Sequence, residues 1–171
     1  MSNAEEIRLF EEIMAFREDV FRICLGFSRN PADAEDLSQD VYLKALGKIG
    51  TLRTPGAARG WLLRIARNTC LDQRKRARLF GLFKIKTAGG EGRAPAAPEG
   101  PEEAPAALAR LKAAVARLPE KQREVFVLRE YGQMSYGEIA ESLGIKAGTV
   151  MSRLSRARSA VAEFVREGGH G

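Results

Sequence analysis

The sequence predicts an all-α protein built from two small helical domains joined by a flexible linker. Apolar residues recur every three or four positions through most of the chain, which is the spacing of one face of a helix. Nowhere do apolar and polar residues alternate over enough positions to predict a half-buried strand. Between positions 87 and 105 the composition changes to Gly, Ala, Pro and Glu, which bury too little apolar surface to become ordered. We therefore expect domains at 5–86 and 106–167 and a linker at 87–105.

The first domain is expected to hold three helices. Apolar spacing predicts one long amphipathic helix over 7–27, which the Asn-Pro pair at 30–31 ends. A second helix begins at 33 or 34 and runs through 46, with acids at its start that complement the helix dipole. Glycines and prolines make 47–60 a loop, and a third helix follows from 61 to about 80. On the second helix we expect inward side chains at Leu37, Val41 and Leu46.

The second domain begins with a helix over 106–117, which Leu118-Pro119 ends. Pro119 then suits the first turn of the next helix, over 120–131, because a backbone N–H at that position would have no acceptor within the helix.

The segment 135–160 carries the pattern of a helix-turn-helix. Ser135 and Glu138 form a capping-box pair at the start of its first helix. Gly144 can take a positive φ in the turn, and Val150 anchors a second helix that begins near Ala147. Such a motif places its second helix in the major groove of DNA.

Charge is sorted by helix. The chain has a net charge of +6 and a sequence pI of about 9.6, which favours a polyanionic partner. Segment 31–46 has four acids and one base, whereas 61–86 has eight bases and one acid, and 145–161 has four bases and no acid. The sequence therefore predicts one acidic helix and two basic helices, with a basic helix in each domain.

Two stretches resemble the sigma-70 family of RNA polymerase sigma factors. DAEDLSQDVYLKAL, a loop and GWLLRIARNTCLDQRKR resemble sigma domain two, and LPEKQREVFVLREYGQMSYGEIAESLGIKAGTVMSRLSRAR resembles sigma domain four. They occur in this order across a linker, and nothing resembles domain three. That layout is similar to the extracytoplasmic-function (ECF) sigma factors.

The resemblance implies three sets of binding residues. Polar contacts to core RNA polymerase are expected from Asp36, Gln39 and Asp40. The −10 element is expected to be read as single-stranded DNA by the loop at 52–60 and the following helix, with candidates Asn68, Arg64 and Arg67. The basic cluster Arg74, Lys75, Arg76 and Arg78 is interpreted from its charge as a set of phosphate contacts, with a solvated helix end as the alternative. The −35 element is expected to meet Thr149, Met151, Ser152, Arg153, Ser155, Arg156 and Arg158. Met151 stands where many members carry Arg or Lys, and Trp61 is interpreted as a core anchor more than a stacking platform.

The expected partners are core RNA polymerase, promoter DNA and an anti-sigma factor. We expect no cofactor, no metal and no small-molecule substrate, because the single histidine lies in a glycine-rich tail and no phosphate loop or Cys/His cluster is present. Without an apolar run of membrane length we expect no membrane insertion and a cytoplasmic location. Cys24 and Cys70 are interpreted as buried, reduced thiols, with a redox pair as the alternative.

Two other functions remain as alternatives. A stand-alone repressor would use only the helix-turn-helix and would form a tight homodimer. A sigma-like decoy that binds an anti-sigma factor is disfavoured, because the chain lacks a receiver domain and keeps both basic helices. An enzyme is the weakest option.

Overall fold

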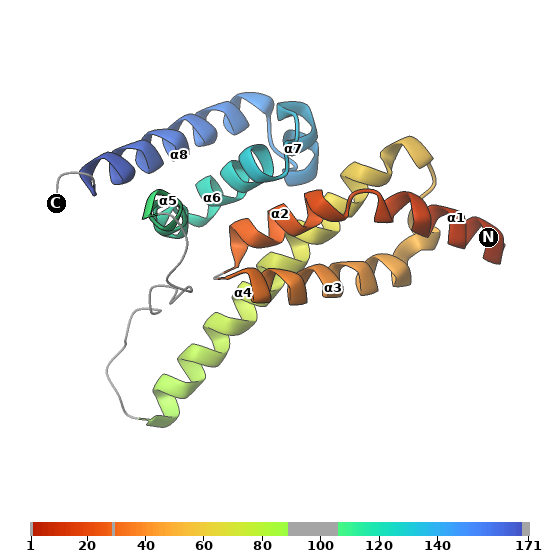
Figure 1. Ribbon diagram of the computed structural model, residues 1–171, viewed down its shortest axis with the longest axis horizontal. Helices are drawn as coiled ribbons and strands as arrows, with labels where there is room; N and C mark the ends of the chain where they lie inside the picture. The colour runs from red at the N-terminus through yellow and green to blue at the C-terminus, as the bar shows by residue number, and fades with distance from the viewer. Residues whose placement is uncertain (1, 29, 89–105, 169–171) are drawn as a thin grey trace.

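The computed structural model describes residues 2–28, 30–88 and 106–168. Every regular element in these ranges is a helix, which confirms the predicted all-α class. The helices form two groups that lie side by side (Figure 1), an N-terminal bundle within residues 3–88 and a C-terminal bundle within 106–167. None of the helices in the described ranges has the length and apolar character needed to cross a membrane.

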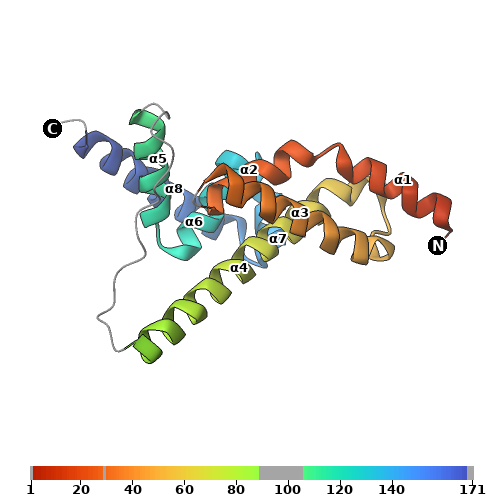
Figure 2. The ribbon, with the colours of Figure 1, turned by 60° about the horizontal axis from the view of Figure 1, so that its bottom comes forward.

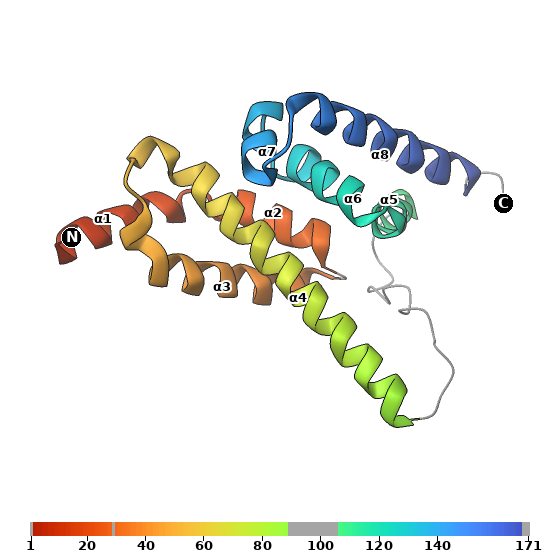
Figure 3. The same cartoon turned by 180° about the vertical axis from the view of Figure 1, so that it is seen from behind.

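The N-terminal bundle consists of α1 (Asn3–Met14), α2 (Arg17–Phe27), α3 (Pro31–Lys48) and α4 (Ala58–Ala88). Helices α2, α3 and α4 pack against one another around a core that excludes water from side chains such as Ile23, Val41 and Leu62. Helix α4 is the longest element, and its C-terminal end projects away from both bundles (Figures 2 and 3).

The prediction of one long helix over 7–27 is wrong, because the chain bends at Ala15 and Phe16. Phe16 has φ −98° and ψ 18°, and its amide bonds the carbonyl of Ile13, three residues back. The hydroxyl of Tyr42 donates to the same carbonyl at 3.3 Å. The apolar spacing continues across the bend, so it did not reveal the break.

Helix α3 begins at Pro31, two or three residues before the predicted start at 33 or 34. The side-chain oxygen of Asn30 caps it by accepting from the amide of Asp33 at 2.8 Å. The predicted inward position of Leu46 is wrong, since half of this side chain is exposed. The buried face follows a three- or four-residue step, and its residues are Ala34, Leu37, Val41 and Ala45.

The predicted loop contains two short turns, η1 (Ile49–Thr51) and η2 (Pro55–Ala57). Helix α4 then begins three residues earlier than predicted and continues to Ala88. Trp61 is half-buried against the core and donates its ring N–H to the hydroxyl of Thr51 at 3.3 Å. Apart from the last two residues of α4, the predicted linker at 87–105 lies outside the described residues.

The C-terminal bundle contains α5 (Ala106–Arg117), α6 (Glu120–Phe126), η3 (Val127–Tyr131), α7 (Tyr136–Leu143) and α8 (Ala147–Glu167). Helix α5 has the predicted bounds. The predicted helix over 120–131 also forms, but its last turn, η3, is a wider π-helix that ends where the amide of Gly132 donates to the carbonyl of Val127 at 3.0 Å. Such turns occur frequently at functional sites.

The two cysteines meet inside the N-terminal bundle. Both are free thiols that are fully buried, and their sulfur atoms lie 3.8 Å apart. The hydrogen bond to Cys24 and burial both raise the pKa of Cys70 well above its usual range.

Burial of both thiols predicts that the native protein resists a thiol reagent. We expect DTNB to modify Cys24 and Cys70 at least about 100-fold more slowly than an exposed thiol, because access requires an opening of the core. A Ser155→Cys variant, with its new thiol on the exposed face of α8, serves as the control. Rapid reaction of two thiols in the native wild type would contradict the packing of α2 against α4.

Candidate nucleic-acid interface

Helices α7 and α8 form the predicted helix-turn-helix. The hydroxyl of Ser135 accepts from the amide of Glu138 at 3.1 Å, and the Glu138 carboxylate accepts from the amide of Ser135 at 2.7 Å. Gly144 has φ 63°, a left-handed conformation that glycine adopts without a Cβ clash. The seam between the helices buries Ile139, Val150 and Leu154. This packing determines which face of α8 points to solvent.

The outward face of α8 carries the predicted −35 contacts. Thr149 and Arg153 are half-buried, and the exposed members of the set are Met151, Ser152, Ser155, Arg156 and Arg158. Arg158 is already paired within the bundle, because its guanidinium donates to the carboxylate of Glu130 at 2.6 Å. That hydrogen bond is the main reason that the pKa of Arg158 is raised. Arg156 therefore offers an exposed guanidinium on this face, whereas Arg158 would have to exchange a partner.

Four of the predicted −10 residues line one face of α4 and point toward the C-terminal bundle. Arg64, Arg67, Arg74 and Arg78 are separated by three, seven and four residues, with the buried Leu71 between the two pairs. Residues three or four apart share a helix face. We call these four side chains the arginine stripe.

Three members of the arginine stripe form ion pairs with carboxylates of the C-terminal bundle. The shortest joins Arg67 to Glu124 at 2.8 Å, with only 19% and 10% of the two side chains exposed. A charge-assisted hydrogen bond of this length is stronger than a neutral one. The other two pairs are longer and more exposed, so each contributes little stability: they are Arg64 with Glu141 at 3.9 Å and Arg78 with Glu120 at 3.5 Å.

Arg74, the fourth member of the stripe, and Arg123 of α6 are partly and almost fully buried between the bundles. Burial is the main cause that lowers the pKa of Arg74, whose Nη1 atom is buried without a hydrogen-bond partner. Arg123 of α6 is 7% exposed and donates to the carbonyl of Gly26 on α2 at 3.3 Å. Burial first, and then the charge of Arg74, lowers the pKa of Arg123 to about 10. The boundary between the bundles thus concentrates positive charge away from water.

The remaining predicted −10 residues, Asn68, Lys75 and Arg76, are exposed to solvent. The side-chain oxygen of Asn68 accepts from the guanidinium of Arg67 at 3.0 Å, which ties it to the edge of the arginine stripe. The structure therefore divides the seven predicted −10 residues into a stripe that contacts the C-terminal bundle and three side chains that face solvent.

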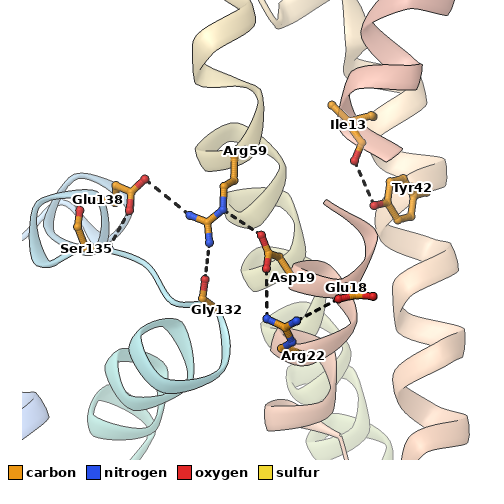
Figure 4. A network of polar contacts seen from close by, with 9 residues as sticks. All are labelled: Ile13, Glu18, Asp19, Arg22, Tyr42, Arg59, Gly132, Ser135 and Glu138. Atoms are coloured by element: carbon orange, nitrogen blue, oxygen red, sulfur yellow. Dashed lines mark hydrogen bonds and ion pairs between the residues drawn. The ribbon is translucent and has the colours of Figure 1, made fainter. Parts of the chain in front are cut away.

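Arg59, the second residue of α4, joins the two bundles (Figure 4). The sequence analysis did not identify it. Its guanidinium donates to the carboxylate of Asp19 on α2 at 2.9 Å and to the carbonyl of Gly132 at 2.6 Å. It also lies 3.8 Å from the carboxylate of Glu138, the capping residue of α7. No local sequence signal distinguishes Arg59 from the other arginines of the chain, because its partners are 40 and 73 residues away.

Helix α3, which carries the predicted docking residues, lies on the far side of α2 from α8 (Figure 1). Asp36, Gln39 and Asp40 are all exposed. Leu43 extends this face with an apolar side chain that is 68% exposed, which the sequence analysis did not single out. Beside it, between α2 and α3, lies a groove of about 630 Å³ whose lining includes Gln39 and Tyr42. An apolar surface with an acidic rim fits a protein partner.

Comparison with family models identifies the class of protein. The model described as Sigma-70 region 2 matches residues 13–80, and that described as Sigma-70, region 4 matches residues 108–161. The chain belongs to the sigma-70 family of RNA polymerase sigma factors, whose members are transcription initiation factors. Its relatives place it more narrowly, among the ECF sigma factors of that family.

Three curated relatives illustrate the match. The chain is 32% identical to the ECF sigma factor SigE of Mycolicibacterium smegmatis, over 91% of this chain and 60% of that protein. It is 28% identical to SigW of Bacillus subtilis, over 89% and 86%. It is 36% identical to SigM of Mycobacterium tuberculosis, over 81% and 67%. The chain thus spans less than two thirds of the first relative and more of the other two.

Two solved structures share the fold. The sigma factor RpoE of Bartonella quintana, solved in complex with the anti-sigma factor NepR, is 28% identical, with a TM-score of 0.69 over 96% of this chain and 98% of that one. CnrH, solved with the cytosolic domain of CnrY, is 23% identical with a TM-score of 0.66 over 93% and 88%. Both matches extend over the two bundles.

Replacing two glycines of the helix-turn-helix by alanine is expected to change the stability in opposite directions. Gly144→Ala should lower the free energy of unfolding by roughly 1 kcal/mol or more, because the left-handed conformation at φ 63° is strained for alanine. Gly148→Ala, in α8 with open space around its Cβ position, should raise it by up to about 1 kcal/mol through helix propensity. Urea unfolding followed by circular dichroism measures both, and equal shifts would contradict the turn geometry.

Proposed function

We propose that this chain directs promoter-specific initiation of transcription by binding core RNA polymerase and recognising the −35 and −10 promoter elements. The observation that carries the proposal is the order of the two sigma regions, each of which coincides with a bundle that has a basic helix. In this proposal residues 5–86 act as sigma domain two, 106–167 act as sigma domain four, and 87–105 connect them.

Recognition of the −35 element is assigned to α8. Thr149, Met151 and Ser152 lie nearest its start, followed by Arg153, Ser155 and Arg156. An arginine can donate to both O6 and N7 of guanine, whereas a serine can meet a base or a phosphate. The exposed face of α8 supports this role, since the inward face is occupied by Val150 and Leu154.

Recognition and melting of the −10 element are assigned to the loop at 52–60 and to α4. A base that is flipped out of the duplex would be held near Asn68, whose amide can pair with a base edge. Arg64, Arg67, Arg74, Lys75, Arg76 and Arg78 would neutralise phosphates of the same strand. Binding energy for unstacked bases replaces covalent chemistry in this process, so the proposed role is not enzymatic.

Docking to core RNA polymerase is assigned to α3 through Asp36, Gln39 and Asp40. The net negative charge of segment 31–46 supports this assignment, because an acidic face would repel DNA and suit a basic protein surface. We also propose an anti-sigma partner, supported by the likeness to RpoE, which was solved with NepR. Because both polymerase and promoter are found in the bacterial cytoplasm, the proposed location is cytoplasmic.

Run-off transcription tests the proposed function. Promoter fragments recovered with the purified protein are transcribed with core RNA polymerase in its presence and absence. We expect a defined transcript only when both proteins are present. Failure to form a stable complex with core polymerase, measured by gel filtration, would rule the function out.

A charge reversal tests the docking face separately. Asp40→Lys should weaken binding to core polymerase by roughly tenfold or more, because it places a positive charge on an acidic contact surface. Glu11→Lys, an equal change on the exposed surface of α1, should leave the affinity within about twofold of wild type. Equal affinities of the two variants, measured by fluorescence anisotropy of labelled protein, would move the docking site away from Asp40.

A further inference from the structure

The two cysteines of the chain lie side by side in the core of the N-terminal bundle. Cys24 of α2 and Cys70 of α4 are 46 residues apart in the sequence, yet the Cys70 thiol donates to the Cys24 sulfur at 3.8 Å. Both are free thiols, and both side chains are fully buried. A disulfide bond is about 2.05 Å long, so the two sulfur atoms need to approach by less than about 2 Å to be joined. The packing of α2 against α4 therefore brings two oxidisable groups almost to bonding distance.

The surroundings make the two thiols unequal. The hydrogen bond from Cys70 is the main cause that lowers the pKa of Cys24, and a hydrogen bond with Ser38 adds to it, while burial opposes both. The same pair raises the pKa of Cys70, and burial raises it further. Because the thiolate and not the thiol attacks an oxidant, Cys24 is the group that reacts first. Cys70 is then in place to react second.

Cys24 also lies next to the groove between α2 and α3. Ser38 and Tyr42 line this groove of about 630 Å³, and both interact with Cys24. Ser38 does so through its hydrogen bond, whereas burial first, and then the charge of Cys24, raises the pKa of Tyr42 to about 12. Half-buried side chains thus separate the sulfur of Cys24 from the groove. A small oxidant needs a smaller local opening to pass them than a bulky reagent such as DTNB does.

We propose that Cys24 and Cys70 form a site of reversible oxidation, at which hydrogen peroxide converts the two thiols into a disulfide that joins α2 to α4. The Cys24 thiolate attacks one peroxide oxygen, the O–O bond breaks, and the departing hydroxide takes the proton released by Cys24 to form water. Cys24 is then a sulfenic acid. The Cys70 sulfur attacks the Cys24 sulfur, the S–O bond breaks, and the hydroxyl group leaves as water with the proton of Cys70. Two thiols and one peroxide therefore give one disulfide and two waters.

The disulfide would change the mechanical freedom of the N-terminal bundle and leave its surface unaltered. It would join the helix that borders the groove, α2, to the helix that carries the arginine stripe, α4. A cross-link between residues 46 positions apart removes much of the conformational freedom of the unfolded chain. Disulfides in reducing compartments are mostly transient and redox-sensing, which fits a reversible reaction. The site does not rest on the proposed function, because it needs only the N-terminal bundle.

Intact-mass analysis tests the disulfide. The reduced full chain is treated with hydrogen peroxide in its native state and then unfolded in urea with N-ethylmaleimide. We expect a monomer that has lost two hydrogens and takes up no maleimide, and dithiothreitol should restore both maleimide adducts. Cys70→Ala/Ser155→Cys has the same number of thiols but no buried pair, so it should form no intramolecular disulfide. A wild type that keeps both thiols, or oxidises them to sulfinic acids instead, would overturn the proposal.

Single variants test the order of attack. In Cys70→Ala the sulfenic acid of Cys24 has no partner thiol, so dimedone added on unfolding should trap it. Cys24→Ala retains only the thiol whose burial raises its pKa, and it should react with peroxide at least about tenfold more slowly. Circular dichroism establishes that both variants are folded. Faster trapping in Cys24→Ala would show that Cys24 is not the attacking sulfur.

Thermal unfolding tests whether the disulfide joins α2 to α4 without disturbing their packing. The oxidised wild type should unfold at a temperature higher than the reduced protein by roughly 10 °C, because the cross-link restricts the unfolded chain. The same peroxide treatment should leave the unfolding temperature of Cys24→Ala unchanged. An unchanged or lower unfolding temperature of the oxidised wild type would overturn the cross-link. These measurements need neither DNA nor polymerase, so they can fail while the transcription assays succeed, and the reverse.

Discussion

The central constraint of this structure is that one helix, α4, has to present an apolar face to one bundle and a cationic face to the other, and the helical repeat keeps the two faces apart. One face supplies the core of the N-terminal bundle with Leu62, Leu63 and Ala66. The other face is the arginine stripe, and Lys75 and Arg76 are exposed to solvent. Because successive residues turn by about 100°, a one-residue shift in the register of α4 would place an arginine in the core. The packing of α4 on α2 and α3 therefore also decides which cations meet the C-terminal bundle.

Elements whose boundaries depend on local chemistry were predictable from the sequence. Ser135 and Glu138 cap α7 by bonding each other, and Gly144 ends it, so all the interacting groups lie within one short segment. The bend between α1 and α2 was not predictable, because the tyrosine that bonds the carbonyl of Ile13 is 29 residues away. The inward position of Leu46 failed for a related reason: the real face of α3 steps from Val41 to Ala45, and a larger apolar residue next to it drew the prediction.

For the candidate site, the sequence indicated which side chains carry charge but not what they contact. Arg67 and Glu124 are separated by 57 residues, and no local pattern relates them. A guanidinium is satisfied equally by a carboxylate or a phosphate, so a basic helix in a sequence is compatible with either partner. The burial of Arg123 was not predicted either. It lies in an ordinary polar stretch of α6, and only the fold reveals that it is buried against Gly26 and Phe27.

Arginine suits the partly buried ion pairs of the stripe better than lysine would. Its guanidinium is planar, keeps its charge and presents a fork of donors that matches carboxylate and phosphate alike, whereas lysine carries a compact and strongly hydrated charge. Arg67 can therefore be mostly buried against Glu124 and keep its charge. Lys75, by contrast, is not a member of the stripe and is exposed to water, which solvates its charge.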